Sequence, residues 1–166
     1  MGIEIERRFL VSSEDWRSQV ILSKNFRQGY LNSNSDGWAT RVRVIDNQQG
    51  CLTLKSSING LVKYEFEYPI PTKDAIELFN LSKYKITKTR YQLKTNKKDW
   101  VVDCFGGSNS SLTIAEIELS SESEHIAVPS WCGQEITGIQ SLSNASLAKT
   151  PISKISIKDR VKAKDP

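Results

Sequence analysis

The stretch "GIEIERRFLV" at residues 2–11 alternates charged and apolar side chains. In a β-strand, successive side chains point to opposite faces, so Glu4, Glu6 and Arg8 would lie together on one face. The other face would carry Ile3, Ile5, Arg7 and Phe9. Two adjacent carboxylates repel each other unless a positive charge lies nearby. The stretch therefore predicts a strand with one highly charged face that needs compensation.

Turn-forming residues divide much of the remaining chain into similar short segments. They are Asp36-Gly37, "DNQQG" at 46–50, Asn59-Gly60, "NKKD" at 96–99 and "FGGSNS" at 105–110. Turns of this kind join antiparallel strands. We expect eight strands, at about 2–11, 26–32, 38–45, 51–57, 61–70, 85–95, 99–105 and 112–119. This pattern predicts an antiparallel meander.

Two segments favour helices. The first is "SSEDWRSQVILSK" at 12–24, where Ser12 or Ser13 would be the N-cap and apolar residues follow at helical spacing. The second follows Pro71 and Thr72, with Ala75, Ile76, Leu78 and Phe79 at helical spacing. We also expect short helical pieces in "SESEHIAVPSW" at 121–131 and "SNASLA" at 143–148.

The charged alternation of the opening stretch recurs along the later segments. One face of the sheet would hold seven basic residues, Arg8, Arg41, Arg43, Lys55, Lys63, Lys88 and Arg90, and seven acidic residues, Glu4, Glu6, Glu65, Glu67, Asp103, Glu116 and Glu118. A solvated outer face gives a similar alternation. However, long charged residues recur here in same-sign pairs, and such pairs persist best where a cation or a polyanion lies between them.

The charged faces are best accommodated inside a closed barrel. We predict an α+β protein, mainly β: an eight-stranded antiparallel barrel with a charged, water-filled lumen and a few covering helices. Both signs of charge in one lumen favour an anion that carries metal, such as a phosphate chain with Mg²⁺ or Mn²⁺. The chain has no G-x-x-x-x-G-K-[ST] or G-x-G-x-x-G motif, so side chains would hold the phosphate.

Composition places limits on the other functional classes. The 166 residues, of which 38% are hydrophobic, suit one domain, predicted at 1–150, and the basic segment 151–166 would be a free tail. No apolar run is long enough to cross a membrane, and Glu4 and Glu6 argue against a signal peptide. Three scattered cysteines and the single His125 argue against a disulfide frame and a multi-histidine metal centre. We expect a cytoplasmic protein without a nucleic-acid partner; a homodimer stays open.

In addition, the chain resembles the CYTH domain, or triphosphate tunnel metalloenzyme, superfamily, most closely its short bacterial single-domain members. The family's E-x-E-x-K motif corresponds to Glu4-Ile5-Glu6-Arg7-Arg8. Other matching stretches run in order along the chain: "QGYL" at 28–31, "TRVRV" at 40–44, "LTLKS" at 52–56, "KYEFEYPIP" at 63–71, "KTRY" at 88–91, "WVVDCF" at 100–105, "AEIEL" at 115–119, "WCGQEITG" at 131–138 and "SNASLA" at 143–148.

The resemblance implies hydrolysis of inorganic tripolyphosphate, or of a nucleoside or thiamine triphosphate, with a divalent metal. Carboxylates suit a hard cation, so the expected ligands are Glu4, Glu6 and Glu118, followed by Glu116 and Asp103. The expected phosphate-binding residues are Arg8, Arg41, Arg43, Lys55, Lys63, Lys88 and Arg90. Water would be activated by the metal with Glu4 and Glu6, or oriented by Glu65, Glu67 or Lys88. Glu65 and Glu67 would otherwise bind a second ion or pair with Arg41 and Arg43.

The chain departs from the family pattern at three places. Arg8 replaces the motif lysine, which keeps the positive charge but removes a group able to donate a proton near neutral pH. Lys63 stands where an arginine is common, and Leu142 with Ser143 replaces a frequent aromatic residue. Three rival functions remain: an adenylate cyclase, a polyphosphate- or nucleotide-binding module without turnover, and a barrel for an apolar ligand.

Overall fold

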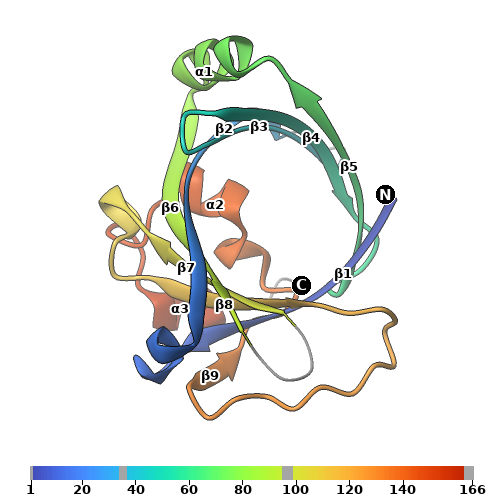
Figure 1. The fold of residues 1–166 in the computed structure, drawn as a ribbon, viewed down its shortest axis with the longest axis vertical. Helices are drawn as coiled ribbons and strands as arrows, with labels where there is room; N and C mark the ends of the chain where they lie inside the picture. The colour runs from blue at the N-terminus through green and yellow to red at the C-terminus, as the bar shows by residue number, and fades with distance from the viewer. Residues whose placement is uncertain (1, 34–36, 95–98, 163–166) are drawn as a thin grey trace.

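The computed structural model describes residues 2–33, 37–94 and 99–162 (Figure 1). Its main feature is a ring of β-strands. The strands are β1 Gly2–Val11, β2 Val20–Ser33, β3 Trp38–Ile45, β4 Gln49–Ser57, β5 Val62–Ile70, β6 Tyr84–Leu93, β7 Trp100–Phe105, β8 Thr113–Glu118 and β9 Cys132–Glu135. The helices are α1 Thr72–Leu81, α2 Asn144–Lys149 and α3 Ile157–Lys162, with 3₁₀ turns η1 Asp15–Gln19, η2 Gly107–Asn109 and η3 Gln140–Leu142.

The first eight strands close into the predicted antiparallel barrel. Their order is β5-β4-β3-β2-β6-β7-β8-β1, and β1 pairs with β5 to complete the ring. Strand β9 pairs with the end of β1 beyond the ring. Closure leaves no open edge on the ring and places one face of every strand in the lumen. The predicted fold class is confirmed.

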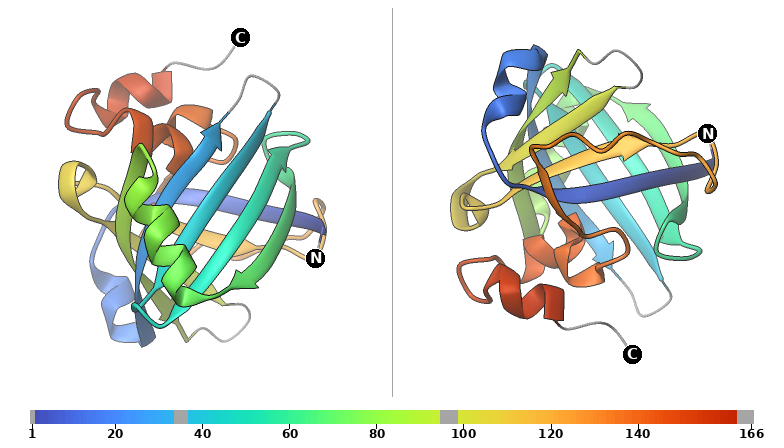
Figure 2. Two further views of the ribbon diagram at one scale, coloured as in Figure 1. Left: turned by 90° about the horizontal axis from the view of Figure 1, so that it is seen from above. Right: turned by 90° about the horizontal axis from the view of Figure 1, so that it is seen from below.

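The apolar residues form three separate cores, none of which fills the middle of the barrel. Phe9, Trp100, Ile117 and Trp131 belong to a cluster on the outer side of β1, β7 and β8. The helix α1 packs Ala75 and Phe79 against Val42 and Val44 of β3 on the opposite side. Figure 2 shows this helix lying across the outside of the sheet. The helix predicted after Pro71 and Thr72 is thus confirmed.

The third core closes one end of the barrel. Tyr30, Ile86 and Phe105 of the strands pack against Ile136, Leu142 and Leu147 from the C-terminal part of the chain. The helix α2, predicted from "SNASLA", begins after Ser143, whose hydroxyl accepts a hydrogen bond from the Ser146 amide at 3.2 Å. We call the segment from η3 through α2, residues 140–149, the plug. Charged residues line the cavity that the plug leaves inside the ring.

The helix predicted over 12–24 is wrong. Only the 3₁₀ turn η1 forms there, and Val20 already begins β2, where it pairs with Leu93 of β6. Trp16 is buried and its ring lies 5.2 Å from the ring of Tyr91. Pairing with β6 over ten positions outweighs a short helical periodicity, because tertiary contacts override weak local propensity.

Two further expectations about local structure need correction. The segment at 121–131 forms no helix, although Ile126 and Trp131 pack on the outer core. Residues 151–162 are not a free tail throughout. Ile152 is buried, and Ile157 and Val161 of α3 pack against the third core. The apolar side chains of this segment, rather than its positive charge, determine its position.

The predicted turns are confirmed where the structure describes them. Asp46 and Asn47 both have positive φ, 49° and 58°, as a tight hairpin between β3 and β4 requires. The Asn59 side chain accepts hydrogen bonds from the amides of Leu61 and Val62 at 2.8 and 2.7 Å. The turns at 36–37 and 96–99 lie largely outside the described residues. Within the described ranges, no helix has the length and apolarity that crossing a bilayer would require.

Gly29 generates a stability prediction, because its outer face lies against the end of α1. A Cβ at this position would lie 2.7 Å from Ser82 Cβ and would also clash with Ser82 Oγ. We expect Gly29→Ala to lower the free energy of unfolding by about 1–3 kcal/mol, measured by urea denaturation. In a Ser82→Gly background the same change should cost clearly less. Equal costs in both backgrounds would contradict this packing argument.

Candidate functional site

A cavity of about 1020 Å³ occupies the barrel, and charged side chains line it. Thirteen of the fourteen residues predicted to face the lumen belong to its wall: Glu4, Glu6, Arg8, Arg41, Arg43, Lys55, Lys63, Glu65, Glu67, Lys88, Arg90, Glu116 and Glu118. Asp103 lies behind the wall, fully buried and bonded to two of its members. The inward orientation predicted from the strand alternation is correct.

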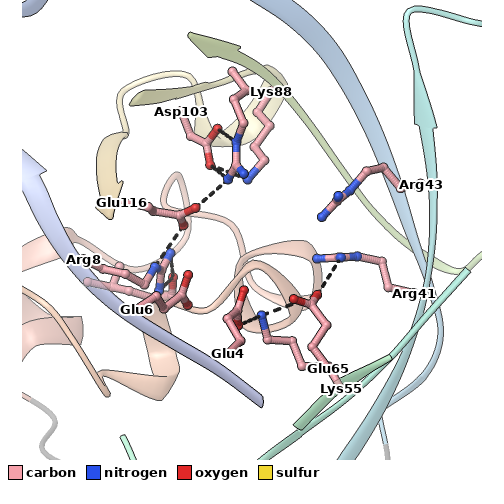
Figure 3. A network of polar contacts seen from close by, with 12 residues as sticks. Glu4, Glu6, Arg8, Arg41, Arg43, Lys55, Glu65, Lys88, Asp103 and Glu116 are labelled. Carbon is pink, nitrogen blue, oxygen red and sulfur yellow. Dashed lines mark hydrogen bonds and ion pairs between the residues drawn. The ribbon is translucent and has the colours of Figure 1, made fainter. Parts of the chain in front are cut away.

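One group of charges spans β1, β6, β7 and β8. Asp103 accepts hydrogen bonds from Arg90 Nε and Nη2 at 2.8 and 2.7 Å, and it also accepts one from Lys88. Arg90 bridges onward to Glu116, which accepts a hydrogen bond from Arg8 Nε at 3.1 Å. Figure 3 shows Lys88, Asp103, Glu116 and Arg8 together on one side of the lumen. We call these five residues the Asp103 network.

Burial and neighbouring charge shift the pKa values in the Asp103 network. Burial lowers the pKa of Lys88 to about 8, an effect that Asp103 opposes and Arg90 reinforces. Burial alone would raise the pKa of Glu116, but Arg90, Lys88 and Arg8 hold it well below its usual range. Asp103 and Glu116 raise the pKa of Arg90 against the effect of burial. Glu116 is thus held as a carboxylate, whereas Lys88 can exchange its proton near neutral pH.

A second group of charges lies across the lumen on β3, β4 and β5. Arg41 Nη2 donates to Thr53 Oγ1 at 3.0 Å and to Glu65 Oε1 at 3.2 Å. Glu67 pairs with both Arg41 and Arg43, each at 3.4 Å. Glu65 and Glu67 therefore pair with the arginines, which is one of the two roles predicted for them. We call these five residues the Arg41 network.

The arginines of the second network lack full compensation. Burial, with a further effect from the positive charge of Arg41, lowers the pKa of Arg43 to about 10. The Nε atoms of Arg41 and Arg43 are buried and have no hydrogen-bond partner. Buried donors of this kind are costly unless something accepts from them. Figure 3 shows both side chains reaching into the lumen toward the space between the two networks.

The carboxylates of β1 and β8 are the candidates for holding a divalent cation. Glu6 lies directly opposite Glu118 in the strand pairing, and Glu4 is on the same face of β1. These are hard oxygen donors, the ligand type that Mg²⁺ and Mn²⁺ prefer. Within the described parts of the chain, no three such groups already lie close enough to hold a metal. Two of these carboxylates form ion pairs with lysines: Glu4 with Lys55, and Glu6 with Lys63.

The donor set thus fits a divalent cation by its chemistry, provided that the lysines release it. Lys55 also lies 3.7 Å from Glu65, so Glu65 offers this lysine another partner. The other two predicted ligands have different partners. Glu116 is held by Arg8 and Arg90, and Asp103 by Lys88 and Arg90. Asp103 is outside the cavity wall, which favours a role in orienting cations.

Arg8, which replaces the motif lysine, connects the barrel wall to the plug. Besides its bond to Glu116, its Nη1 and Nη2 both donate to the carbonyl oxygen of Leu142 at 3.3 Å. Its own amide donates to Thr137 Oγ1 at 3.0 Å. A lysine has one nitrogen and cannot reproduce this fork of donors. The arginine is therefore matched to the plug of this particular chain.

The sequence analysis did not single out several uncharged residues on the inner side of the barrel. Gln28 and Phe26 lie on the inner face of β2, and both amide atoms of Gln28 are buried without hydrogen-bond partners. Tyr30 and Asn144 line the cavity at the plug end. Tyr30 also belongs to the third core. The alternation of side chains along β2 could have placed Phe26, Gln28 and Tyr30 on one face. These residues are uncharged, so they lack the same-sign charge pairs that marked the other strands.

The arrangement as a whole is suited to a polyanion. The two networks face each other across the lumen, and their arginine and lysine side chains are paired with carboxylates. An apolar ligand is excluded by the charged wall, because it could not compensate the buried ions. Oxygen atoms of a condensed phosphate could accept from the donors on both sides.

Comparison with known proteins gives a consistent family. The family model for the CYTH domain matches residues 2–150. An inorganic triphosphatase of Acetivibrio thermocellus is 40% identical over 155 residues, covering 91% of this chain and 96% of the relative.

Solved structures agree with this match. The crystal structure of the inorganic triphosphatase NE1496 is 30% identical with a TM-score of 0.65, covering 87% of this chain and 93% of that one. The putative adenylyl cyclase HpAC1 from Hippeastrum, for which a dominant triphosphatase activity is described, has a TM-score of 0.55. It is 15% identical over 73% of this chain and 80% of its own, so this likeness shows the fold alone.

The pKa of Lys88 predicts a pH dependence of anion binding. Lys88 is charged below about pH 8 and neutral above it, while Arg90 and Glu116 near it keep their charges. The affinity for sulfate, measured by calorimetry, should therefore weaken above pH 8, by at most about tenfold per pH unit. Lys88→Arg should remove this dependence because arginine stays charged. An affinity of the unmodified protein that stays constant from pH 7 to 9 would contradict the argument.

Arg8 forms a clamp, because it donates to both Glu116 and the Leu142 carbonyl. This clamp predicts that replacing Arg8 lowers the stability of the protein more than replacing its neighbour Arg7. We expect Arg8→Lys to lower the free energy of unfolding by roughly 1–3 kcal/mol, because a buried carbonyl or carboxylate loses its donor. Arg7→Lys is the matched control, since Arg7 forms a two-bond pair with Glu135 on the exposed outer side. That change should cost less than about 1 kcal/mol. Urea denaturation of both variants measures the difference, and a larger cost at Arg7 would refute the clamp.

Proposed function

Because this chain belongs to the CYTH domain family, we propose that it hydrolyses inorganic triphosphate inside the barrel with the help of a divalent cation. The observation that carries the proposal is that arginine and lysine side chains face each other across the cavity, with buried arginine donors that lack acceptors. A triphosphate is a linear chain of acceptors with high negative charge, which matches the donors on both sides at once. The 40% identical relative is an inorganic triphosphatase, which supports this substrate class.

The phosphate chain would lie between the Asp103 and Arg41 networks. Arg41 and Arg43 would contact it from one side, and Lys88 and Arg90 from the other. Lys55, Lys63 and Arg8 would complete the set of cations around it. Charge built up on the phosphoryl oxygens as the bond breaks would be stabilised by these fixed groups. Glu65, Glu67 and Asp103 would keep the paired arginines oriented while substrate and metal enter and products leave the lumen.

The metal-binding role is assigned to Glu4, Glu6 and Glu118, with Glu116 next to them. A bound Mg²⁺ or Mn²⁺ would polarise phosphate oxygens and lower the pKa of water. For the lysines paired with Glu4 and Glu6, we propose that they exchange these carboxylates for phosphate oxygens. Exchange keeps every charge compensated in both states, which lowers the cost of binding.

Lys88 is the proposed group for moving a proton. Hydrolysis gives the leaving phosphate an oxygen that takes up a proton, and a buried lysine with a pKa of about 8 can supply one near neutral pH. Arg8 cannot do so, because an arginine keeps its proton. Glu65 and Glu67 are left to orient Arg41 and Arg43, and through them the substrate.

We also propose that the substrate is a free small molecule and that the protein acts in the cytoplasm. The three cysteines are all free thiols, as a reducing compartment favours. No membrane or nucleic-acid partner is needed for a site enclosed within a barrel.

The experiment that tests this function is a phosphate-release assay. We expect release from tripolyphosphate with Mg²⁺ or Mn²⁺ and none after the metal is chelated. ATP, GTP and thiamine triphosphate should be compared at equal concentration. Cyclic AMP formed from ATP would support a cyclase instead, and tight binding of tripolyphosphate without any release would support a binding module.

Glu6 generates the mutational prediction. Glu6→Gln removes a carboxylate from the cavity, and we expect at least about a 100-fold loss of tripolyphosphate hydrolysis with the fold retained. Glu135→Gln is the matched control. Glu135 lies on β9, outside the ring, and pairs there with Arg7 of β1. Its activity should stay within about twofold of the unmodified protein. Comparable losses in the two variants would remove Glu6 from the proposed machinery.

A further inference from the structure

Phe26 is an aromatic residue in contact with two of the lumen's arginines. It lies on β2, between β3 and β6 in the sheet order, and it is 6% exposed. The guanidinium carbon of Arg43, on β3, is 5.1 Å from the centre of its ring. The guanidinium carbon of Arg90, on β6, is 5.5 Å from the same centre. Both distances are within the range of a cation–π contact.

The two guanidinium groups are positively charged and repel each other, so their contact with the same ring needs an explanation. Arg90 is one of the charges that lower the pKa of Arg43, which shows that the two guanidinium groups interact. Arg90 is held firmly, because Asp103 and Glu116 both pair with it. Among the described residues, the ion pair that Arg43 makes is the 3.4 Å contact with Glu67, and its Nε has no hydrogen-bond partner. The aromatic ring is therefore a major restraint on Arg43.

We propose that Phe26 is a positioning residue that holds the guanidinium groups of Arg43 and Arg90 beside each other, so that both donate to one phosphate group. The proposal rests on the proposed function, because it takes the anion to be a phosphate of the substrate. Phe26 is not part of the cavity wall, so it acts only through the two arginines. The negative face of the ring offsets part of their repulsion while the lumen holds no anion.

The chain contains a matched control for this arrangement. Phe79 of α1 is also buried, and its ring is likewise contacted by two cations, Arg27 at 5.1 Å and Lys85 at 5.4 Å. Phe79 packs with Val42 and Val44 of β3, and α1 lies on the outer side of the barrel (Figure 2). Replacing either phenylalanine with leucine removes an aromatic ring and two cation–π contacts. Only the change at Phe26 affects cations that face the cavity.

The first test compares Phe26→Leu, Phe26→Tyr and Phe79→Leu in tripolyphosphate hydrolysis. We expect Phe26→Leu to raise KM about tenfold or more, with a smaller effect on kcat, because the arginines no longer meet the anion in a fixed arrangement. Phe26→Tyr keeps the ring and should restore KM to within about threefold. Phe79→Leu should lose similar thermal stability but keep its KM. An unchanged KM in Phe26→Leu, or an equal rise in Phe79→Leu, would overturn the proposal.

The second test needs neither a variant nor activity. A proton above an aromatic ring is shifted upfield in an NMR spectrum, so the side-chain resonances of Arg43 and Arg90 should both be shifted upfield in the unmodified protein without substrate. Ordinary shifts for either arginine would overturn the proposal even if Phe26→Leu fails to fold. If the unmodified protein hydrolyses no triphosphate while both shifts are present, the proposed function fails, and Phe26 still holds the two arginines.

Discussion

Mutual compensation of charge inside the barrel is the constraint on which the rest of this structure depends. The fourteen charged side chains predicted to face the lumen all lie on or directly behind the wall of one cavity, and an isolated charge in such a place would be very costly. Two networks of ion pairs lie on opposite sides of the lumen, and two further pairs join Lys55 to Glu4 and Lys63 to Glu6, so that carboxylates lie next to cations throughout. Removing one partner leaves a buried charge without compensation, so the networks behave as units.

This constraint explains why the apolar cores lie elsewhere. A barrel with a charged interior cannot be stabilised from within, so it buries apolar surface on its outer faces and at one end. The outer core under Trp131, the packing of α1 on β3 and the plug supply this burial. The plug has a second effect, because its Leu142 carbonyl accepts from Arg8 and so connects the closed end of the barrel to the charged wall.

The same arrangement prepares the site for an anion. A buried cation whose charge is only partly compensated, such as Arg43, is stabilised most when an anionic ligand enters. Lysines paired with carboxylates can exchange partners when a phosphate and a metal arrive together. Fixed donors that need little rearrangement are the usual basis of electrostatic stabilisation in phosphoryl transfer. The family membership and the geometry therefore lead to the same chemistry by separate routes.

The sequence by itself determined the eight strands of the ring, except for the first part of β2, and their charged inward faces, because a period of two assigns every second residue of a strand to one face. From Glu4 to Glu118, these assignments hold. Only the tertiary structure decided which charges pair across the lumen, that Asp103 lies behind the wall and that residues 20–24 belong to β2. It also revealed Phe26 and Gln28 on the inner face of β2. These features depend on strand register and closure, which bring distant residues together and which local periodicity does not encode.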